Sequence, residues 1–107
     1  MQSVFERGNR VESRGFVLLW RPGTGGRKAG FAVSRRVGGA VQRNRVRRRL
    51  REAYRRSTPF PPDLLLVFVG RTAAGSAPFP DLIAEMERAA ARVGSRAGSP
   101  GALAPSR

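Results

Sequence analysis

The hydrophobic residues of this chain follow two different periods, which separate candidate strands from candidate helices. Residues 16–20 (FVLLW) are rich in strand-favouring residues, and residues 28–34 alternate apolar with small or polar positions. Residues 64–69 (LLLVFV) are apolar throughout, which is typical of a central strand covered on both faces. We therefore expect strands at residues 10–13, 16–20, 28–34 and 64–69.

Two longer segments have the 3.6-residue period of amphipathic helices. Residues 40–56 contain neither Gly nor Pro and are rich in good helix formers. Their apolar arc consists of Val46, Leu50, Ala53 and Tyr54. The second helix is expected to begin at Pro80 and to end at Gly94. Its apolar stripe consists of Leu82, Ile83, Met86, Ala90 and Val93. A short helical segment over residues 1–7 completes the expected elements.

The order of these elements predicts an α+β domain. The first three strands follow one another through short connections, so we expect them to form an antiparallel meander. The fourth strand follows the third through the helix at 40–56, which predicts a parallel β-α-β crossover through that helix. Residues 94–107 consist mainly of Gly, Ser, Ala, Pro and Arg, a composition typical of a flexible tail. One domain is thus expected at 1–93.

Charge changes this picture most strongly in the first helix. Residues 40–56 carry eight arginines against one acid, Glu52, and the whole chain has a net charge of +14. Arginines three and four positions apart on a helix repel one another by roughly a few tenths of a kcal/mol each. A polyanion removes this repulsion, and the planar guanidinium suits phosphate oxygens. The segment is therefore interpreted as a nucleic-acid contact, with a solvated basic face as the plain alternative.

The residue types that are missing exclude several classes of function. Cysteine and histidine are absent, which excludes disulfides, thiol catalysis and thiolate metal sites. The seven acidic residues are scattered, so the polypeptide is expected to hold neither a catalytic residue nor a metal ion. No apolar run approaches the ~18 residues of a membrane span, and no signal segment opens the chain. A cytoplasmic protein without a membrane partner is expected; a membrane-active helix is disfavoured by the narrow apolar arc.

One stretch carries an ordered motif, GFAVSRRVGGAVQRNRVRRRLREAYR, at residues 30–55. It contains a strand ending in Val-Ser-Arg-Arg, a Gly-Gly-Ala-Val link, Arg-Asn-Arg, and a basic helix closing with Arg-Glu-Ala-Tyr. This order resembles the family of bacterial ribonuclease P protein subunits, and a looser similarity extends over residues 4–93. The resemblance implies an αβββαβα two-layer sandwich like that of ribosomal protein S5 domain 2.

The resemblance also implies a function and its partners. The expected partners are the catalytic RNA of ribonuclease P and the 5′ leader of precursor tRNA, with no protein partner required. The expected activity is endonucleolytic removal of the leader, carried by the RNA subunit with Mg²⁺ that the RNA holds.

The resemblance places RNA contacts in the strand end and the basic helix. The expected RNA-binding residues are Ser34, Arg35, Arg36, Arg43, Asn44, Arg45, Arg47, Arg48, Arg51 and Arg55. A cleft for the single-stranded leader is expected between the open face of the sheet and this helix. Phe5, Phe16 and Leu19 occupy the matching cleft positions.

Composition alone leaves a second function open, because a structural RNA-binding protein of the ribosomal type would share the basic helix and the strand arrangement. The ordered motif from Val33 to Tyr54 is the feature that favours the ribonuclease P family over this alternative.

Overall fold

The fold is seen in a computed structural model that describes residues 9–57 and 59–97, with side chains through residue 94. The helical segment expected at residues 1–7 lies outside the described residues. The elements in chain order are β1 (Asn9–Glu12), β2 (Phe16–Pro22), β3 (Lys28–Val33), the 3₁₀ helix η1 (Arg35–Val37), α2 (Ala40–Arg56), β4 (Leu64–Gly70), the 3₁₀ helix η2 (Thr72–Gly75) and α3 (Phe79–Ala97). The expected strands and both long helices are therefore present.

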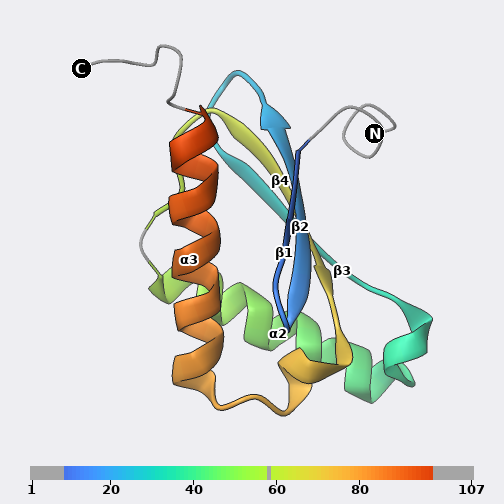
Figure 1. Cartoon of the computed structure of the whole chain (residues 1–107). Helices are drawn as coiled ribbons and strands as arrows, with labels where there is room; N and C mark the ends of the chain where they lie inside the picture. Colours follow the sequence, from blue (N-terminus) through green and yellow to red (C-terminus); the bar gives the residue numbers. More distant parts are fainter. Residues whose placement is uncertain (1–8, 58, 98–107) are drawn as a thin grey trace.

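The strands form one sheet in the order β1-β2-β4-β3 (Figure 1). β3 and β4 are parallel and are joined through α2, which confirms the predicted crossover. The predicted meander of the first three strands is wrong, because β4 lies between β2 and β3 and pairs with both. The central position suits β4 because its alternate residues Leu64, Leu66 and Phe68 are buried there, whereas β3 has Lys28, Gly30 and Ala32 exposed. The expectation that this strand is covered on both faces is wrong, because Leu65, Val67 and Val69 on the other face are only half-buried.

The connection from β2 to β3 passes over the start of β4. It is held by Asp63, whose backbone oxygen accepts from Gly23 N at 2.8 Å and whose Oδ1 accepts from Gly26 N at 2.8 Å. Gly25 and Gly26 have φ values of 79° and 99°, a region that residues with a side chain rarely adopt. The glycine-rich loop thus spans two strand spacings where a tight hairpin would have placed β2 beside β3.

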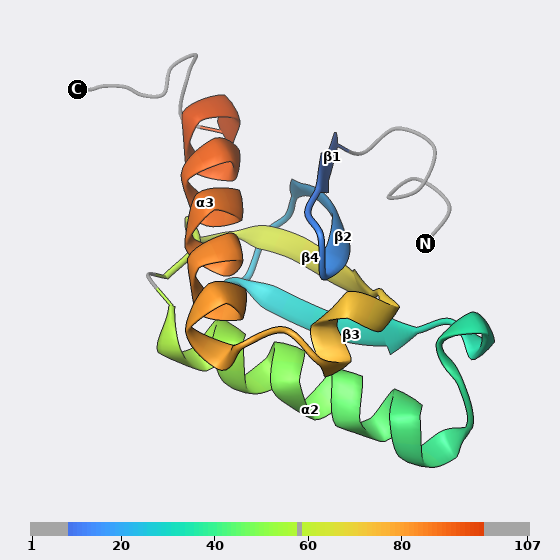
Figure 2. The same cartoon turned by 60° about the horizontal axis from the view of Figure 1, so that its bottom comes forward.

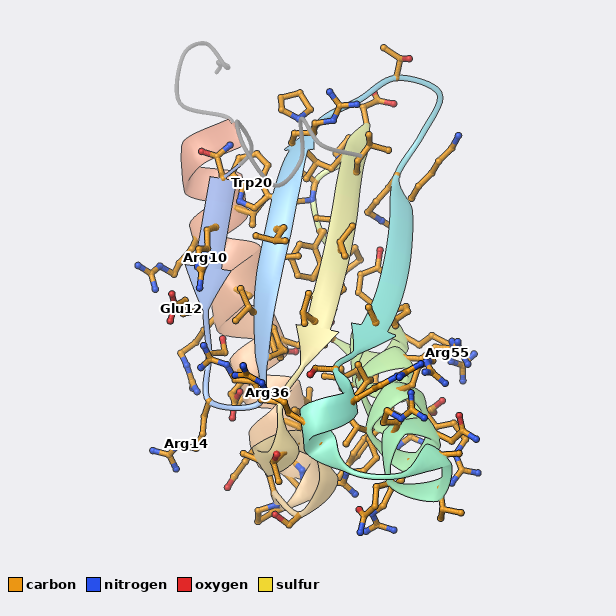
Figure 3. All side chains as sticks on the ribbon, turned by 90° about the vertical axis from the view of Figure 1, so that its right-hand side faces the viewer. Arg10, Glu12, Arg14, Trp20, Arg36 and Arg55 are labelled. Atoms are coloured by element: carbon orange, nitrogen blue, oxygen red, sulfur yellow. The ribbon has the colours of Figure 1, made fainter. Side chains whose placement is uncertain are left out.

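Both helices cover the same face of the sheet, which makes a two-layer sandwich (Figures 1 and 2). Alternate residues of β2 and β4 point toward the helices and are buried: Phe16, Leu18, Trp20, Leu64, Leu66 and Phe68. The helices contribute Val46, Leu50, Leu82, Met86 and Val93 to the same core. The other face of the sheet is turned toward the viewer in Figure 3, with both helices behind it.

α2 docks closely on the end of β4 because Gly70 has no side chain. A Cβ atom at Gly70 would lie 2.6 Å from Val46 Cγ1 and 3.0 Å from Leu50 Cδ1. This close approach fixes the depth and the rotation of α2, and hence the direction in which its polar face points.

α3 extends beyond its expected end. The prediction that Gly94 stops this helix is wrong, since α3 runs to Ala97. A glycine terminates a helix by adopting a positive φ, and the positive-φ glycines of the described part of the chain do not include Gly94. Neither α2 nor α3 is apolar enough over a sufficient length to cross a membrane, and the described residues contain no other long helix.

Candidate RNA interface

The segment before α2 is a compact turn that places two arginines beside the start of the helix. The Ser34 hydroxyl accepts from Arg36 N at 3.0 Å and so caps η1. Gly38 then turns the chain with a φ of 144°, and its N–H donates to the Arg35 carbonyl at 3.1 Å. The Ser34 and Gly38 positions of the motif therefore have a local structural reason. Arg35 and Arg36 are left exposed.

α2 is anchored by the arc that its sequence predicts. Val46, Leu50 and Ala53 are buried, with 1%, 0% and 0% of their surface exposed. Tyr54 is half-buried among Phe31, Phe60 and Phe68. The predicted arc is confirmed, and it leaves the remaining positions of the helix for polar side chains.

The arginines on one flank of α2 hold the polypeptide together. Arg45 Nε donates to the Gly75 carbonyl at 2.9 Å, and Arg49 Nε donates to the Ala74 carbonyl at 2.7 Å. Arg49 also donates through Nη2 to the Ala77 carbonyl. The guanidinium carbons of Arg49 and Arg56 lie 5.6 and 5.7 Å from the centre of the Phe79 ring. We call Arg45, Arg49 and Arg56 the loop flank, because they fasten η2 and the start of α3 to α2.

The side of α2 opposite the core has a different character. We call Asn44, Arg48, Arg51 and Arg55 the outer face of α2; all four are exposed. Arg48 has no hydrogen bond or ion pair to any residue that the structure describes. Arg51 contacts the Phe31 ring at 5.7 Å and makes no hydrogen bond or ion pair within the same part of the chain. Free guanidiniums on an anchored helix are well placed to bind an anion.

The other residues that are expected to bind RNA differ in whether their polar atoms already have partners within the protein. Asn44 Oδ1 accepts from Arg47 Nη1 at 2.7 Å, and Arg55 forms an ion pair with Glu52 at 3.3 Å. Arg43 is half-buried, and its Nε has no partner among the described residues. In Figure 3, Arg36 lies at one end of the sheet and Arg55 beside β3.

Glu52 is the single acid within α2, and two arginines surround it. Its pKa is lowered, first by the hydrogen bond from Arg55 and then by the one from Arg56. Arg56 Nε donates to Glu52 Oε2 at 2.8 Å. Glu52 therefore stays ionised and reduces the positive charge at the C-terminal end of α2, while Arg48 and Arg51 keep their charge uncompensated.

The residues expected in the leader cleft do not share one face of the sheet. Phe16 has 0% of its surface exposed and packs edge-on against Phe68, with 5.4 Å between ring centres. The expectation that Phe16 lines a cleft is contradicted, because its ring belongs to the core beneath the helices. Leu19 lies on the opposite, open face and is 9% exposed. Phe5 lies outside the described residues.

The open face carries further apolar residues that the sequence prediction missed. Leu19 stands opposite Val67, and Val17 stands opposite Val69, in the register of β2 and β4. These side chains form an apolar strip next to Arg21, which pairs in register with Leu65. The three valines of the strip are half-buried, and Leu19 is almost fully buried. The alternation of residues 16–20 contains this information, since positions 17 and 19 must point to one side and positions 16, 18 and 20 to the other.

The sequence matches the family described as Ribonuclease P over residues 1–94. The chain belongs to the ribonuclease P protein family. It is 40% identical over 98 residues to the ribonuclease P protein component of Gluconacetobacter diazotrophicus, covering 87% of this chain and 84% of the relative. It is also 40% identical over 99 residues to the ribonuclease P protein component of Acidothermus cellulolyticus, covering 86% and 80%.

Solved structures agree with this family in their fold. The RNase P protein from Thermotoga maritima superposes with a TM-score of 0.75 at 24% identity, covering 85% of this chain and 88% of that one. The RNase P protein from Staphylococcus aureus superposes with a TM-score of 0.63 at 22% identity, covering 81% and 82%. The predicted α+β sandwich is confirmed. As a ribonuclease P protein component, the chain is an RNA-binding subunit of a ribonucleoprotein in tRNA processing, which decides against the ribosomal-type alternative.

Proposed function

We propose that this subunit binds the catalytic RNA of ribonuclease P and the 5′ leader of precursor tRNA, chiefly through η1 and the outer face of α2. The observation that carries the proposal is the division of the α2 arginines. Arg48 and Arg51 are exposed and make no hydrogen bond or ion pair to the described residues, whereas the loop flank has partners in η2 and α3. Phosphate groups supply the acceptors that the outer face lacks.

The mechanism in this proposal is electrostatic and positional. The catalytic RNA and its precursor substrate are both polyanions, and arginines held between them reduce their mutual repulsion. Precursor tRNA should gain more affinity than mature tRNA, because only the precursor carries a leader. The Mg²⁺ requirement should fall, since bound arginines replace part of the counterions that condense on RNA.

The proposal assigns bond cleavage to the RNA subunit and not to protein side chains. The chain has no His or Cys. Glu12 and Glu52 are each ion-paired with arginines, and Glu85 accepts a hydrogen bond from Gly15 N at 2.9 Å. The described residues contain no cluster of three potential metal ligands, so these side chains do not fit a protein-held Mg²⁺ site. In this proposal Mg²⁺ belongs to the RNA, and the complex works in the cytoplasm.

The open face of the sheet supplies the second half of the leader site. Leu19, Val67 and Val69 form an apolar strip beside the cationic residues of β2 and β3. Unpaired strands are usually held where a cationic groove adjoins aromatic side chains. In this proposal Leu19 keeps its expected place in the leader site, and aliphatic contact takes the place of the ring that Phe16 buries.

Reconstitution tests this function. The purified chain is added to a bacterial ribonuclease P RNA, and cleavage of a precursor tRNA is followed at low and at high Mg²⁺. We expect the protein to restore cleavage when Mg²⁺ is scarce and to have little effect when it is abundant. An unchanged rate at low Mg²⁺ would overturn the proposal. A variant with Arg48→Ala and Arg51→Ala is the matched control, and it should restore cleavage poorly while remaining folded.

A further inference from the structure

A groove of about 650 Å³ lies between the β1–β2 turn, the residues after η2, and the outer side of α3. β1 is the edge strand farthest from β3, and α3 packs against β1 while α2 packs against β3 and β4. The groove is therefore at the opposite edge of the sheet from the outer face of α2. In Figure 3, Arg14 at the turn and Arg55 on α2 point away from opposite sides of the sheet.

The rim of this groove carries arginines without acceptors. Arg14 extends from the β1–β2 turn, and Arg88 and Arg92 lie four positions apart on α3. All three are exposed and have no hydrogen bond or ion pair within the part of the chain that is described. Arg88 and Arg92 are like charges at a spacing that weakens a helix. We call this site, with Arg14, Arg88 and Arg92 at its rim, the α3 groove.

The turn that presents Arg14 is held rigidly. Gly15 N donates to Glu85 Oε1 at 2.9 Å, and Arg71 N donates to the Gly15 carbonyl at 2.9 Å. Arg71 Nη1 also donates to the Ser13 carbonyl at 2.9 Å. These bonds tie both sides of Arg14 to α3 and to the residue after β4. A backbone that is already fixed loses little further conformational freedom when the side chain that it carries binds.

The acids near the groove leave these arginines uncompensated. Glu12 is already bound by Arg10 at 2.9 Å and by Arg71 at 3.3 Å. Glu85 is 7% exposed and is turned toward Gly15. Asp81 is exposed and lies in the first turn of α3, where the helix dipole favours a negative charge.

We propose that the α3 groove is a second binding site for phosphate groups of RNA in the ribonuclease P complex, with Arg14, Arg88 and Arg92 as its contacts. This inference rests on the proposed function, which makes a large RNA the partner. Arginine surfaces at both edges of the sheet allow one protein to contact two separate RNA segments, and each contact raises the effective concentration for the other. A membrane surface is a poorer partner because Ala77, Ala84 and Ala89 in the groove offer little apolar area for insertion.

Salt-dependent binding tests the proposal quantitatively. Binding of the full chain to a bacterial ribonuclease P RNA is measured over a range of salt concentrations. In the variant with Arg14→Gln, Arg88→Gln and Arg92→Gln, the negative slope of log K against log[salt] should become shallower by about 2 to 3, as expected when three phosphate contacts are lost. The variant with Arg14→Lys, Arg88→Lys and Arg92→Lys keeps the positive charges, so it should keep most of the salt dependence of the wild type. Asp81→Asn should bind more tightly than the wild type, because a repelling charge has been removed.

A probe attached to a single cysteine tests position without removing any arginine. The chain has no cysteine, so Ser76→Cys in the groove and Val41→Cys at the start of α2 each give one attachment site for a radical-generating iron chelate. Val41 is 82% exposed and serves as the positive control. We expect cleavage of the RNA from both sites, at different nucleotides.

The outcomes separate this inference from the proposed function. If the wild type binds and activates the RNA but the Gln variant keeps its full slope and Ser76→Cys gives no cleavage, the α3 groove is not an RNA site and the proposed function stands. If the wild type neither binds nor activates the RNA, both fail. A shallower slope in the Gln variant with cleavage from Ser76→Cys supports the inference.

Discussion

The loop flank and the outer face of α2 are both arginine-rich, yet their surroundings differ. Arg45 and Arg49 donate to backbone carbonyls of η2 and its neighbours, and Arg49 also covers the Phe79 ring. Arg48 and Arg51, on the outer face, have no hydrogen-bond acceptor among the described residues. Counting arginines in the sequence therefore overestimates the number of guanidiniums that are free to bind RNA. One group of arginines stabilises the fold and another remains available for binding.

The loop flank and the outer face both depend on the packing of α2 against the sheet, so disrupting this packing should have the largest effect. Leu50 of α2 is fully buried and lies against Gly70 at the end of β4. Leu50→Ala should lower the free energy of unfolding by about 2 to 5 kcal/mol, because it removes buried methyl groups and leaves a cavity. Urea denaturation followed by circular dichroism measures the change. A decrease of less than about 1 kcal/mol in the free energy of unfolding would show that α2 does not pack on the sheet as described.

A substitution on the loop flank should affect stability more than binding. Arg49→Ala removes two hydrogen bonds to carbonyls and the contact with Phe79. We expect the free energy of unfolding to fall by about 1 to 3 kcal/mol. The salt dependence of RNA binding, measured below the melting temperature, should stay unchanged. A stable Arg49→Ala protein with weakened RNA binding would reverse the assignment of this flank.

A substitution on the outer face should do the opposite. Arg48 makes no hydrogen bond or ion pair to the described part of the chain, so Arg48→Ala should change the free energy of unfolding by less than about 0.5 kcal/mol. Affinity for the catalytic RNA should fall to a similar degree whatever the local RNA sequence, because a phosphate contact is lost. Filter binding and thermal melting of the same preparation give both quantities, and a large drop in melting temperature would contradict the prediction.

The smallest effect on stability and RNA binding is expected from a substitution of Glu52, which pairs with Arg55 of the outer face and with Arg56 of the loop flank. Glu52→Gln frees Arg55 and Arg56 from their ion pairs, so RNA binding should become tighter and more salt-dependent. In the wild type the lowered pKa of Glu52 means that its contribution to stability is present at neutral pH. That contribution is lost as the pH falls through the lowered pKa. Melting temperatures of both proteins from pH 7 to pH 3 should converge at low pH; a constant difference would exclude this role.

Local periodicity predicted the elements and the buried arc of α2, because one face of a helix or strand determines where each side chain points. The position of β4 between β2 and β3 depends on the glycine-rich loop around Gly25, whose span a strand pattern does not specify. The placing of Phe16 in the leader cleft came from the family resemblance, and the alternation of β2 already opposed it. Carbonyl partners of Arg45 and Arg49 come from a segment 25 to 30 residues away, so only the tertiary structure reveals them.

The central claim is that arginines free of internal partners on η1 and α2 neutralise RNA phosphates. Its most direct test is the slope of log K against log[salt] for binding to a bacterial ribonuclease P RNA, in the wild type and in the Arg48→Ala/Arg51→Ala variant. If about five arginines of η1 and α2 are engaged, they should contribute roughly −3.5 to −4.5 to the wild-type slope, apart from any contribution of the α3 groove. The variant should be shallower by about 1.4 to 1.8. A wild-type slope near zero, or a variant with the wild-type slope, would contradict the account.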